Sequence, residues 1–235
     1  MESNFVDVWH GCLLHPRVDI DGLSALMSEQ EKLKADTFKH CDMRRRYITV
    51  RATLRRLLAG YLNSDPVALE FNVSEHGKPY LVCGSIHFNL SHTANHLLIA
   101  VANFPDIGVD IEEIKSRVNF DGLAARCFST RELQAWRKLS LDEQQQAFYR
   151  LWVKKEAFVK AVGRGLALGL DQCEVELAAD GQLLSIPFAY GMATDWLMTE
   201  MAIDSAVQAA LATRSCQYDL RLMSLDNGLN HAAKF

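Results

Sequence analysis

Residues 148–160 constrain the fold of this chain more than any other stretch. The segment has no proline or glycine and carries good helix formers at its centre, so we expect a helix. Trp152, Glu156 and Lys160 are spaced by four and share one face of that helix. Gly163 follows directly, and a glycine there is a common helix stop. Taken alone, this face is more typical of a surface helix with an ordinary Glu–Lys ion pair.

Size and composition indicate a globular protein with a sizeable core. The 235 residues are 49% hydrophobic and 23% charged, which suits one large domain or two small ones. The net charge of −4 argues against nucleic-acid and membrane partners. The first residues lack the basic character of a signal peptide, and the six cysteines form no C-x-x-C pair. We therefore expect a cytoplasmic protein without a disulfide framework or a zinc site.

The N-terminal part alternates predicted helices and strands. Ser28 and Glu31 form a capping box for a helix that reaches about residue 40. A second helix begins near Asp42, with an apolar stripe at helical spacing and arginines on the other face. Most of these arginines are expected in solvent, whereas the cluster at 44–46 has the chemistry to meet phosphate. Strands are expected at residues 5–9, 69–73, 86–90 and 97–104.

A pair of carboxylates marks the next predicted strand, residues 107–111. Asp110 and Glu112 alternate along the chain and project from the same face. Two neighbouring carboxylates repel each other unless a cation or a base lies between them. The pattern is equally typical of a metal site and of a strand edge that runs into an acidic turn.

The C-terminal part begins with helices and ends with short strands. Helices are expected at residues 120–128, from the cap at Ser129, and at 142–162. Strands are expected at 173–177, 205–212 and 218–223, with a hairpin turn at Asp180-Gly181. If the chain has two halves, the turn at Pro105-Asp106 is the best break, which gives residues 1–105 and 106–235.

The charged motifs together predict phosphoryl transfer. Hard cations such as Mg²⁺ take a few carboxylates and leave positions for substrate phosphates. Asp110, Glu112 and Glu156 would supply the carboxylates. Positioning and charge neutralisation do most of the catalytic work in such reactions. The basic residues that would meet phosphate are Lys78, His92, Lys155, Lys160 and the cluster at 44–46.

Five short motifs occur in order along the chain. They are Gly77-Lys78-Pro79, Phe88-Asn89-Leu90-Ser91-His92, Gly108-Val109-Asp110-Ile111-Glu112, Phe128-Ser129 with Glu132, and Trp152-Val153-Lys154-Lys155-Glu156 with Lys160. In this order and spacing they resemble a known family, the Sfp-type (surfactin-synthetase-activating) 4′-phosphopantetheinyl transferases. The resemblance covers about residues 28–170, and the length suits the larger, pseudo-dimeric members. It implies an α+β fold of two similar halves, each a small, mainly antiparallel sheet packed with helices, with coenzyme A in the cleft between them. We expect a monomer.

The resemblance also implies an activity. The enzyme would move the phosphopantetheine arm of coenzyme A onto a serine of an apo acyl or peptidyl carrier protein and release adenosine 3′,5′-bisphosphate. Asp110, Glu112 and Glu156 would hold Mg²⁺, or Mn²⁺ in its place. Glu156 would also be the base for the serine, and Lys160 would steady the pyrophosphate as it leaves.

The same resemblance assigns the coenzyme contacts. His92, Lys78 and Arg46 would grip the phosphates, with Ser91 beside the pyrophosphate. Lys155 belongs to the same expected phosphate set. Lys34 corresponds to a lysine near the 3′-phosphate, whereas a second lysine expected three residues earlier is Glu31 here.

Two alternatives use the same residues differently. One is another Mg²⁺-dependent enzyme of coenzyme A or nucleotide diphosphates, such as a pyrophosphohydrolase, although the Glu-rich helix signature of the Nudix class is absent. Turnover of coenzyme A without a carrier protein would identify it. The other is a binding module that holds coenzyme A or a carrier protein without chemistry, which the three intact carboxylates argue against.

Overall fold

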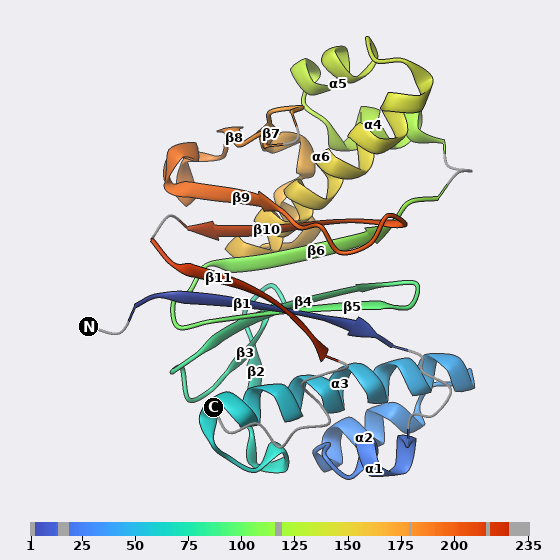
Figure 1. The fold of residues 1–235 in the computed structure, drawn as a ribbon, viewed down its shortest axis with the longest axis vertical. Coiled ribbons are helices and arrows are strands. Elements are labelled where there is room, and N and C mark those ends of the chain that lie inside the picture. The colour runs from blue at the N-terminus through green and yellow to red at the C-terminus, as the bar shows by residue number, and fades with distance from the viewer. Residues whose placement is uncertain (1–2, 14–18, 116–118, 179, 215–216, 226–235) are drawn as a thin grey trace.

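Two long helices, α3 (Cys41–Leu62) and α6 (Leu141–Val162), enclose two small β-sheets (Figure 1). The computed structural model describes residues 3–13, 19–115, 119–178, 180–214 and 217–225. The layers run from α3 through both sheets to α6, so that each sheet has a helix on its outer side. The protein has the predicted α+β fold.

The first sheet has the strand order β11-β1-β5-β4. Its antiparallel part consists of β1 (Phe5–Cys12), β4 (His87–Thr93) and β5 (His96–Ala102). Alternate residues of β5 are apolar on both faces, because both faces are covered. One set, which includes Ile99, packs in a core with Leu54 and Leu58 of α3, and the other set faces the second sheet.

The second sheet has the order β6-β10-β9 and is antiparallel throughout. It consists of β6 (Ile107–Glu113), β9 (Trp196–Glu200) and β10 (Val207–Arg214). Val109, Ile111 and Leu211 share a buried core with Val8 of β1. The opposite face of β10 packs with α6 around Phe158. The two sheets therefore share a core and bury each other's inner faces.

Shorter elements complete the described part of the chain. Helices α1 (Ile20–Ser24) and α2 (Glu29–Asp36) lie beside α3, while α4 (Phe120–Cys127) and α5 (Thr130–Trp136) lie near the first half of α6 (Figure 1). Two small hairpins are formed by β2 (Phe71–Val73) with β3 (Pro79–Leu81), and by β7 (Glu174–Val175) with β8 (Leu183–Ser185). Among the described helices, none combines the length and apolar character that a membrane span needs.

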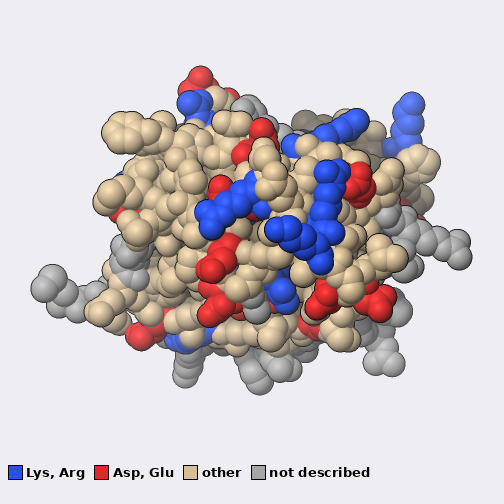
Figure 2. Space-filling model, turned by 90° about the horizontal axis from the view of Figure 1, so that it is seen from above, with Lys and Arg blue, Asp and Glu red and all other residues tan. Residues whose placement is uncertain are grey.

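The face above α4 and α5 carries charges of both signs. Figure 2 shows basic side chains lying beside acidic ones there. Two ion pairs involve α5 and the residue that follows it: Arg131–Glu174 at 3.3 Å and Arg137–Asp121 at 3.0 Å. Such exposed pairs are worth about 0–1 kcal/mol each, so they add little to stability.

The last described strand returns to the first sheet. β11 (Asp219–Ser224) lies at the sheet edge, parallel to β1. The Arg221 guanidinium donates to both carboxylate oxygens of Asp7, each at 2.6 Å, and the Tyr61 hydroxyl of α3 also donates to Asp7. Asp7 is fully buried, so this pairing compensates a charge that would otherwise be costly. A division at Pro105-Asp106 thus leaves β11 in the N-terminal sheet.

Local sequence signals account for the helix ends. The capping boxes at Ser28 and Ser129 form as predicted, and Gly163 ends α6 in the left-handed conformation. The sequence predicts Asp42 as the cap of α3, but α3 begins one residue earlier, at Cys41, with His40 in the cap position and no side-chain cap. The sequence did not predict α1, β3, β8 or β9. The predicted strand at 69–73 is shorter because residues 66–68 form a 3₁₀ turn.

Gly108 sets how closely α6 approaches β6. A Cβ atom built on it would lie 2.1 Å from the Ala157 carbonyl oxygen and 2.4 Å from the Ala161 nitrogen. Both atoms belong to the α6 backbone, so no side-chain movement relieves the contact. Only a residue without a side chain permits this approach, which brings the second half of α6 directly over β6.

We predict that Gly108→Ala destabilises the fold by several kcal/mol, at the upper end of overpacking effects of about 1–3 kcal/mol. Gly122→Ala in α4 is the matched control. Its Cβ would meet only the Asn119 side chain at ordinary distances of 3.6 Å and more. Thermal and urea unfolding of the two variants checks the prediction. Equal stability of both variants would show that α6 does not depend on this contact.

Candidate active site

The site is built where β4 of the first sheet meets β6 of the second. Alternate side chains of β4 point toward β6 because strand residues alternate in direction. The Ser91 hydroxyl donates to Asp110 Oδ1 at 2.8 Å, and the Thr93 hydroxyl donates to Glu112 Oε2 at 3.2 Å. Farther along, the Asn89 side-chain oxygen accepts a 2.8 Å hydrogen bond from the Val109 N–H. β4 thus orients both predicted carboxylates of β6.

Lys160 of α6 reaches the same point from the other side. Its Nζ lies 2.6 Å from Asp110 Oδ1 and 2.8 Å from Ser91 Oγ. The Lys160 side chain is 28% exposed, whereas that of Asp110 is only 4% exposed. Within the described part of the chain, Asp110 Oδ2 is buried without a hydrogen-bond partner. Asp110 Oδ1 therefore has two hydrogen-bond partners, whereas Oδ2 can accept a further ligand.

Glu156 lies one helical turn before Lys160 and belongs to the same electrostatic cluster. Burial raises its pKa to about 7, the charges of Asp110 and Glu112 add to the rise, and Lys160 opposes it. The pKa of Glu112 is also raised, by burial and then by Asp110. Asp110, Glu112, Glu156 and Lys160 therefore lie within electrostatic range of one another. A carboxylate that titrates near neutrality is suited to accept a proton.

The donor set has the chemistry that suits a hard divalent cation. In the described residues, however, no group of three or more His, Cys, Asp or Glu is placed so that it could hold a metal ion. The three carboxylates nevertheless offer the oxygen ligands that Mg²⁺ prefers, and their mutual repulsion is of the kind that a cation relieves. The unpartnered Asp110 Oδ2 gives such an ion a buried ligand.

The assignment of Lys155 to phosphate binding is wrong. Its side chain is fully buried, and its ammonium lies 2.6 Å from Glu132 Oε2. It also donates to the carbonyl oxygens of Cys127, Leu170 and Cys173. Glu132 is buried as well and caps α5 through Ser129 N–H. Lys155 therefore holds α6, α5 and the segment after α6 together, and no part of it is available to a ligand.

Three hollows meet at the turn between β2 and β3. The turn residues at 76–79 line cavities of about 210 Å³, 450 Å³ and 710 Å³ in different combinations. Lys160 lines the smallest, together with Lys78 and Gly163. Lys34, Tyr47 and Arg51 line the second, on the side of α2 and α3. Lys160 therefore contacts Asp110 and also lines the 210 Å³ cavity.

Lys78 is tied to the backbone at the junction of the two sheets. Its Nζ donates to the carbonyl oxygens of Ile107 and Ala161 at 3.0 and 2.8 Å. Burial lowers the pKa of Lys78 to about 8. These contacts anchor the β2–β3 turn to β6 and to the end of α6, so the ammonium already has two partners.

The remaining predicted phosphate residues lie nearer the surface. Lys34 is exposed, with its Nζ 5.9 Å from the ring centre of Tyr47. Arg46 donates to the carbonyl oxygen of Ala94 in the β4–β5 turn. Partial desolvation, followed by the charges of Lys160 and Arg46, holds the pKa of His92 below its usual value. His92, Arg46 and Lys160 therefore contribute to one electropositive region beside the carboxylates.

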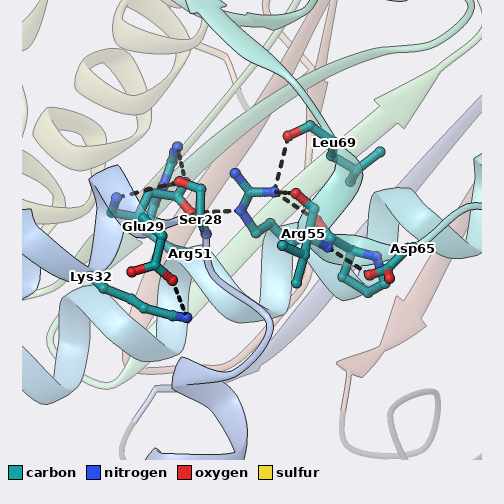
Figure 3. Close-up of polar contacts among 10 residues, drawn as sticks. Ser28, Glu29, Lys32, Arg51, Arg55, Asp65 and Leu69 are labelled. Carbon is teal, nitrogen blue, oxygen red and sulfur yellow. Dashed lines mark hydrogen bonds and ion pairs between the residues drawn. The ribbon is translucent and has the colours of Figure 1, made fainter.

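Glu31 is a structural residue. Its side chain lies 2.6 Å from Arg51 and 2.6 Å from Arg55. Figure 3 shows these arginines side by side, with Arg55 also directed at the Leu69 carbonyl oxygen, 3.0 Å away. Burial alone would raise the pKa of Glu31, but Arg55, Arg51 and the Ser28 N–H outweigh it and hold the pKa below its usual value. The acidic residue thus compensates two arginines of α3.

Sequence reasoning gave no role to Thr93 and gave Glu132 only a place in a helix cap. Thr93 follows Ser91 by two residues, so strand alternation placed it on the same face as Ser91 and was the available signal. The role of Glu132 depends on the position of Lys155 in the folded core, which its capping motif does not reveal.

Comparison with known proteins agrees with this geometry. The sequence profile of the 4′-phosphopantetheinyl transferase superfamily matches residues 106–211. The 4′-phosphopantetheinyl transferase HetI of Nostoc sp. is 33% identical over 214 residues, which cover 89% of this chain and 88% of that protein. A 4′-phosphopantetheinyl transferase of Bacillus subtilis is 35% identical, over 69% of this chain and 72% of its own. The transferase Sfp of Bacillus subtilis strain 168 is 32% identical, over 68% and 70% respectively.

The matched region contains β6 and α6, which carry Asp110, Glu112, Glu156 and Lys160. The relatives extend the likeness over most of the chain. From this combination of site and sequence we conclude that the chain belongs to the 4′-phosphopantetheinyl transferase superfamily, as a member of the Sfp type.

Proposed function

We propose that this enzyme transfers the 4′-phosphopantetheine arm of coenzyme A to a serine hydroxyl of an apo acyl or peptidyl carrier protein. The serine oxygen attacks the pantetheine-side phosphorus of the pyrophosphate. The bond from that phosphorus to the bridging oxygen breaks, and adenosine 3′,5′-bisphosphate leaves with the electron pair. The observation that carries the proposal is the cluster of Asp110, Glu112, Glu156 and Lys160 at the junction of β4, β6 and α6.

Glu156 is proposed as the base that takes the serine proton. Its pKa of about 7 leaves a substantial fraction ionised at neutral pH while keeping it basic enough to accept a proton. Lys160 is proposed to neutralise the charge that builds on the leaving pyrophosphate oxygen. Its partial exposure and its place on the wall of the 210 Å³ cavity support this role.

Asp110, Glu112 and Glu156 would hold Mg²⁺, or Mn²⁺ in its place. The ion would supply positive charge to the pyrophosphate as its negative charge increases. Asp110 Oδ2 and the mutual repulsion of the carboxylates support this assignment.

The coenzyme contacts are proposed on both sides of the β2–β3 turn. His92, Arg46 and Lys34 remain candidates for phosphate contacts, with Ser91 beside the pyrophosphate. For Lys78 the proposal is narrower: its ammonium is committed to two carbonyl oxygens, so it would position the turn more than it would hold phosphate. Lys155 is no longer part of the set.

We also propose that residues 1–105 and 106–235 form two related halves with the site between them, and that the enzyme is a cytoplasmic monomer. Each half contributes a 22-residue helix packed on a small, mainly antiparallel sheet. β4 comes from the first half, while β6 and α6 come from the second. The family assignment lends no support to a pyrophosphohydrolase or a non-catalytic binding module.

Mass spectrometry of a panel of apo-carrier proteins tests the function. After incubation with coenzyme A, Mg²⁺ and the enzyme, we expect one or more carriers to gain a single phosphopantetheine on serine. A parallel reaction without any carrier should leave coenzyme A intact. Turnover in that control would instead indicate a hydrolase.

Glu156→Gln should separate catalysis from stability. Because general-base loss typically costs about 10²–10⁴ in rate, we expect single-turnover transfer to slow at least about a hundredfold while coenzyme A still binds. Ionised Glu156 is unfavourable in the folded state, since its pKa rises from 4.5 to about 7 on folding. In EDTA the variant should therefore be more stable than wild type at pH 8, by roughly 1–3 kcal/mol.

The direction of this stability difference follows from the neutral side chain of Gln. Both proteins are uncharged at this position below pH 4.5, so the stability gain should vanish there and grow as pH rises toward about 7. Urea unfolding at pH 4 and pH 8 measures this. A pH-independent difference together with unchanged transfer would rule Glu156 out as a buried base.

Two lysines five residues apart should respond in opposite ways. Lys155→Met leaves Glu132 buried without its counter-ion, so we expect a loss of about 3–5 kcal/mol of stability. Lys160→Met leaves Asp110 its hydrogen bond from Ser91, so it should lose less stability than Lys155→Met while losing transfer rate. Thermal melts and single-turnover assays of both variants make the comparison. Wild-type transfer by Lys160→Met would remove this residue from the site.

A further inference from the structure

The ammonium of Lys160 closes a small polar triangle with Asp110 and Ser91. Its Nζ contacts Asp110 Oδ1 at 2.6 Å and Ser91 Oγ at 2.8 Å, while the Ser91 hydroxyl donates to the same Oδ1 at 2.8 Å. Asp110 is 3% exposed, so Lys160 supplies its counter-charge in a site that water barely reaches. A carboxylate so buried depends on such a partner.

Lys160 also serves the rest of the carboxylate cluster. Its positive charge favours the ionised forms of both Glu112 and Glu156. Lys160 thus pairs directly with Asp110 and only partly offsets the charges of the other two carboxylates. A divalent ion bound by these ligands would carry out the same electrostatic task at the same place, and two cations there would repel each other.

The Lys160 side chain can also extend into a cavity. It is 28% exposed, and it lines the 210 Å³ cavity with Lys78 and Gly163. A lysine side chain is flexible and its ammonium has three donors, so it can exchange partners without movement of the helix. Asp110 and Ser91 contact it on one side, and the cavity is open to it on the other.

We propose that Lys160 is a tethered counter-ion that competes with the divalent cation for Asp110. With a divalent ion held by Asp110, the Lys160 ammonium would lose its carboxylate partner and would turn toward the cavity, where it could contact a pyrophosphate group. The proposal rests on the proposed function for the identity of the metal and of the anion. It adds an order to the site, because the metal must bind before Lys160 becomes available to the substrate.

The first test measures metal affinity in the absence of coenzyme A. Binding of Mn²⁺ to wild type, Lys160→Met and Lys160→Gln is followed by electron paramagnetic resonance of the free ion. Coupling between two ligands typically changes affinity about 5–150-fold, so we expect both variants to bind Mn²⁺ at least about fivefold more tightly. Ser91→Ala, which removes the second partner of Lys160, should give a smaller gain in the same direction.

Lys32→Met is the matched control. Lys32 forms an ion pair of similar length with Glu29, at 2.7 Å on α2, so its removal changes the net charge equally. We expect it to leave Mn²⁺ affinity unchanged. Equal or weaker binding by the two Lys160 variants, or an equal gain with Lys32→Met, would overturn the proposal. So would an absence of Mn²⁺ binding to every protein.

A second test uses the wild-type enzyme and needs no variant to fold. Acetic anhydride labels lysines, and peptide mass spectrometry reports the labelling rate of Lys160 and of Lys32 as Mn²⁺ is added. We expect Lys160 labelling to rise with metal occupancy while Lys32 labelling stays constant. A Lys160 rate that does not change at saturating Mn²⁺ would mean that the ion binds Asp110 without displacing the lysine. Both tests stand apart from carrier-protein transfer, so a failed transfer assay would not be mistaken for a failed competition.

Discussion

The close packing of α6 on β6 is the constraint from which the site follows. At Gly108 the backbone of the strand comes within contact distance of the α6 backbone at Ala157 and Ala161. These residues flank Lys160 on the helix, and Gly108 lies two residues before Asp110 on the strand. Helix and strand are therefore fixed to each other at the point where their charged side chains must meet. The larger cores position the layers, but this contact sets the distance between Asp110 on β6 and Lys160 on α6.

Position on α6 decides what each of its lysines does. Leu151, Lys155 and Phe158 are all fully buried and follow the helical spacing of the core-facing stripe. Lys155 therefore enters the core and needs Glu132 there. Lys160 lies on the stripe of Trp152 and Glu156, at the edge of the core, where one side meets Asp110 and the other meets a cavity. The same functional group is structural in one place and chemically available in the other.

The sequence was sufficient for the parts of the site that local periodicity controls. The spacing of Glu156 and Lys160 and the alternation of Asp110 and Glu112 gave two faces, and the fold brings those faces together. The role assigned to Lys155 rested on its basic side chain alone and failed because Lys155 lies on the core-facing stripe of Leu151 and Phe158, where it pairs with Glu132. The pairing of β11 with β1 could not be predicted from local sequence, since it involves a contact between Asp7 and Arg221, which are 214 residues apart.

Glu31 shows how a change at one position is compensated by its neighbours. A lysine there would lie beside Arg51 and Arg55, and three cations in a largely buried region would repel strongly. A carboxylate instead bonds both arginines, and Arg55 in turn donates to the carbonyl oxygens of Pro66 and Leu69 that follow α3. The acid thus stabilises α2, α3 and the turn into β2 as one unit. Its charge is paired with two arginines within the protein, so it would present little repulsion to a phosphate at Lys34, the contact proposed above.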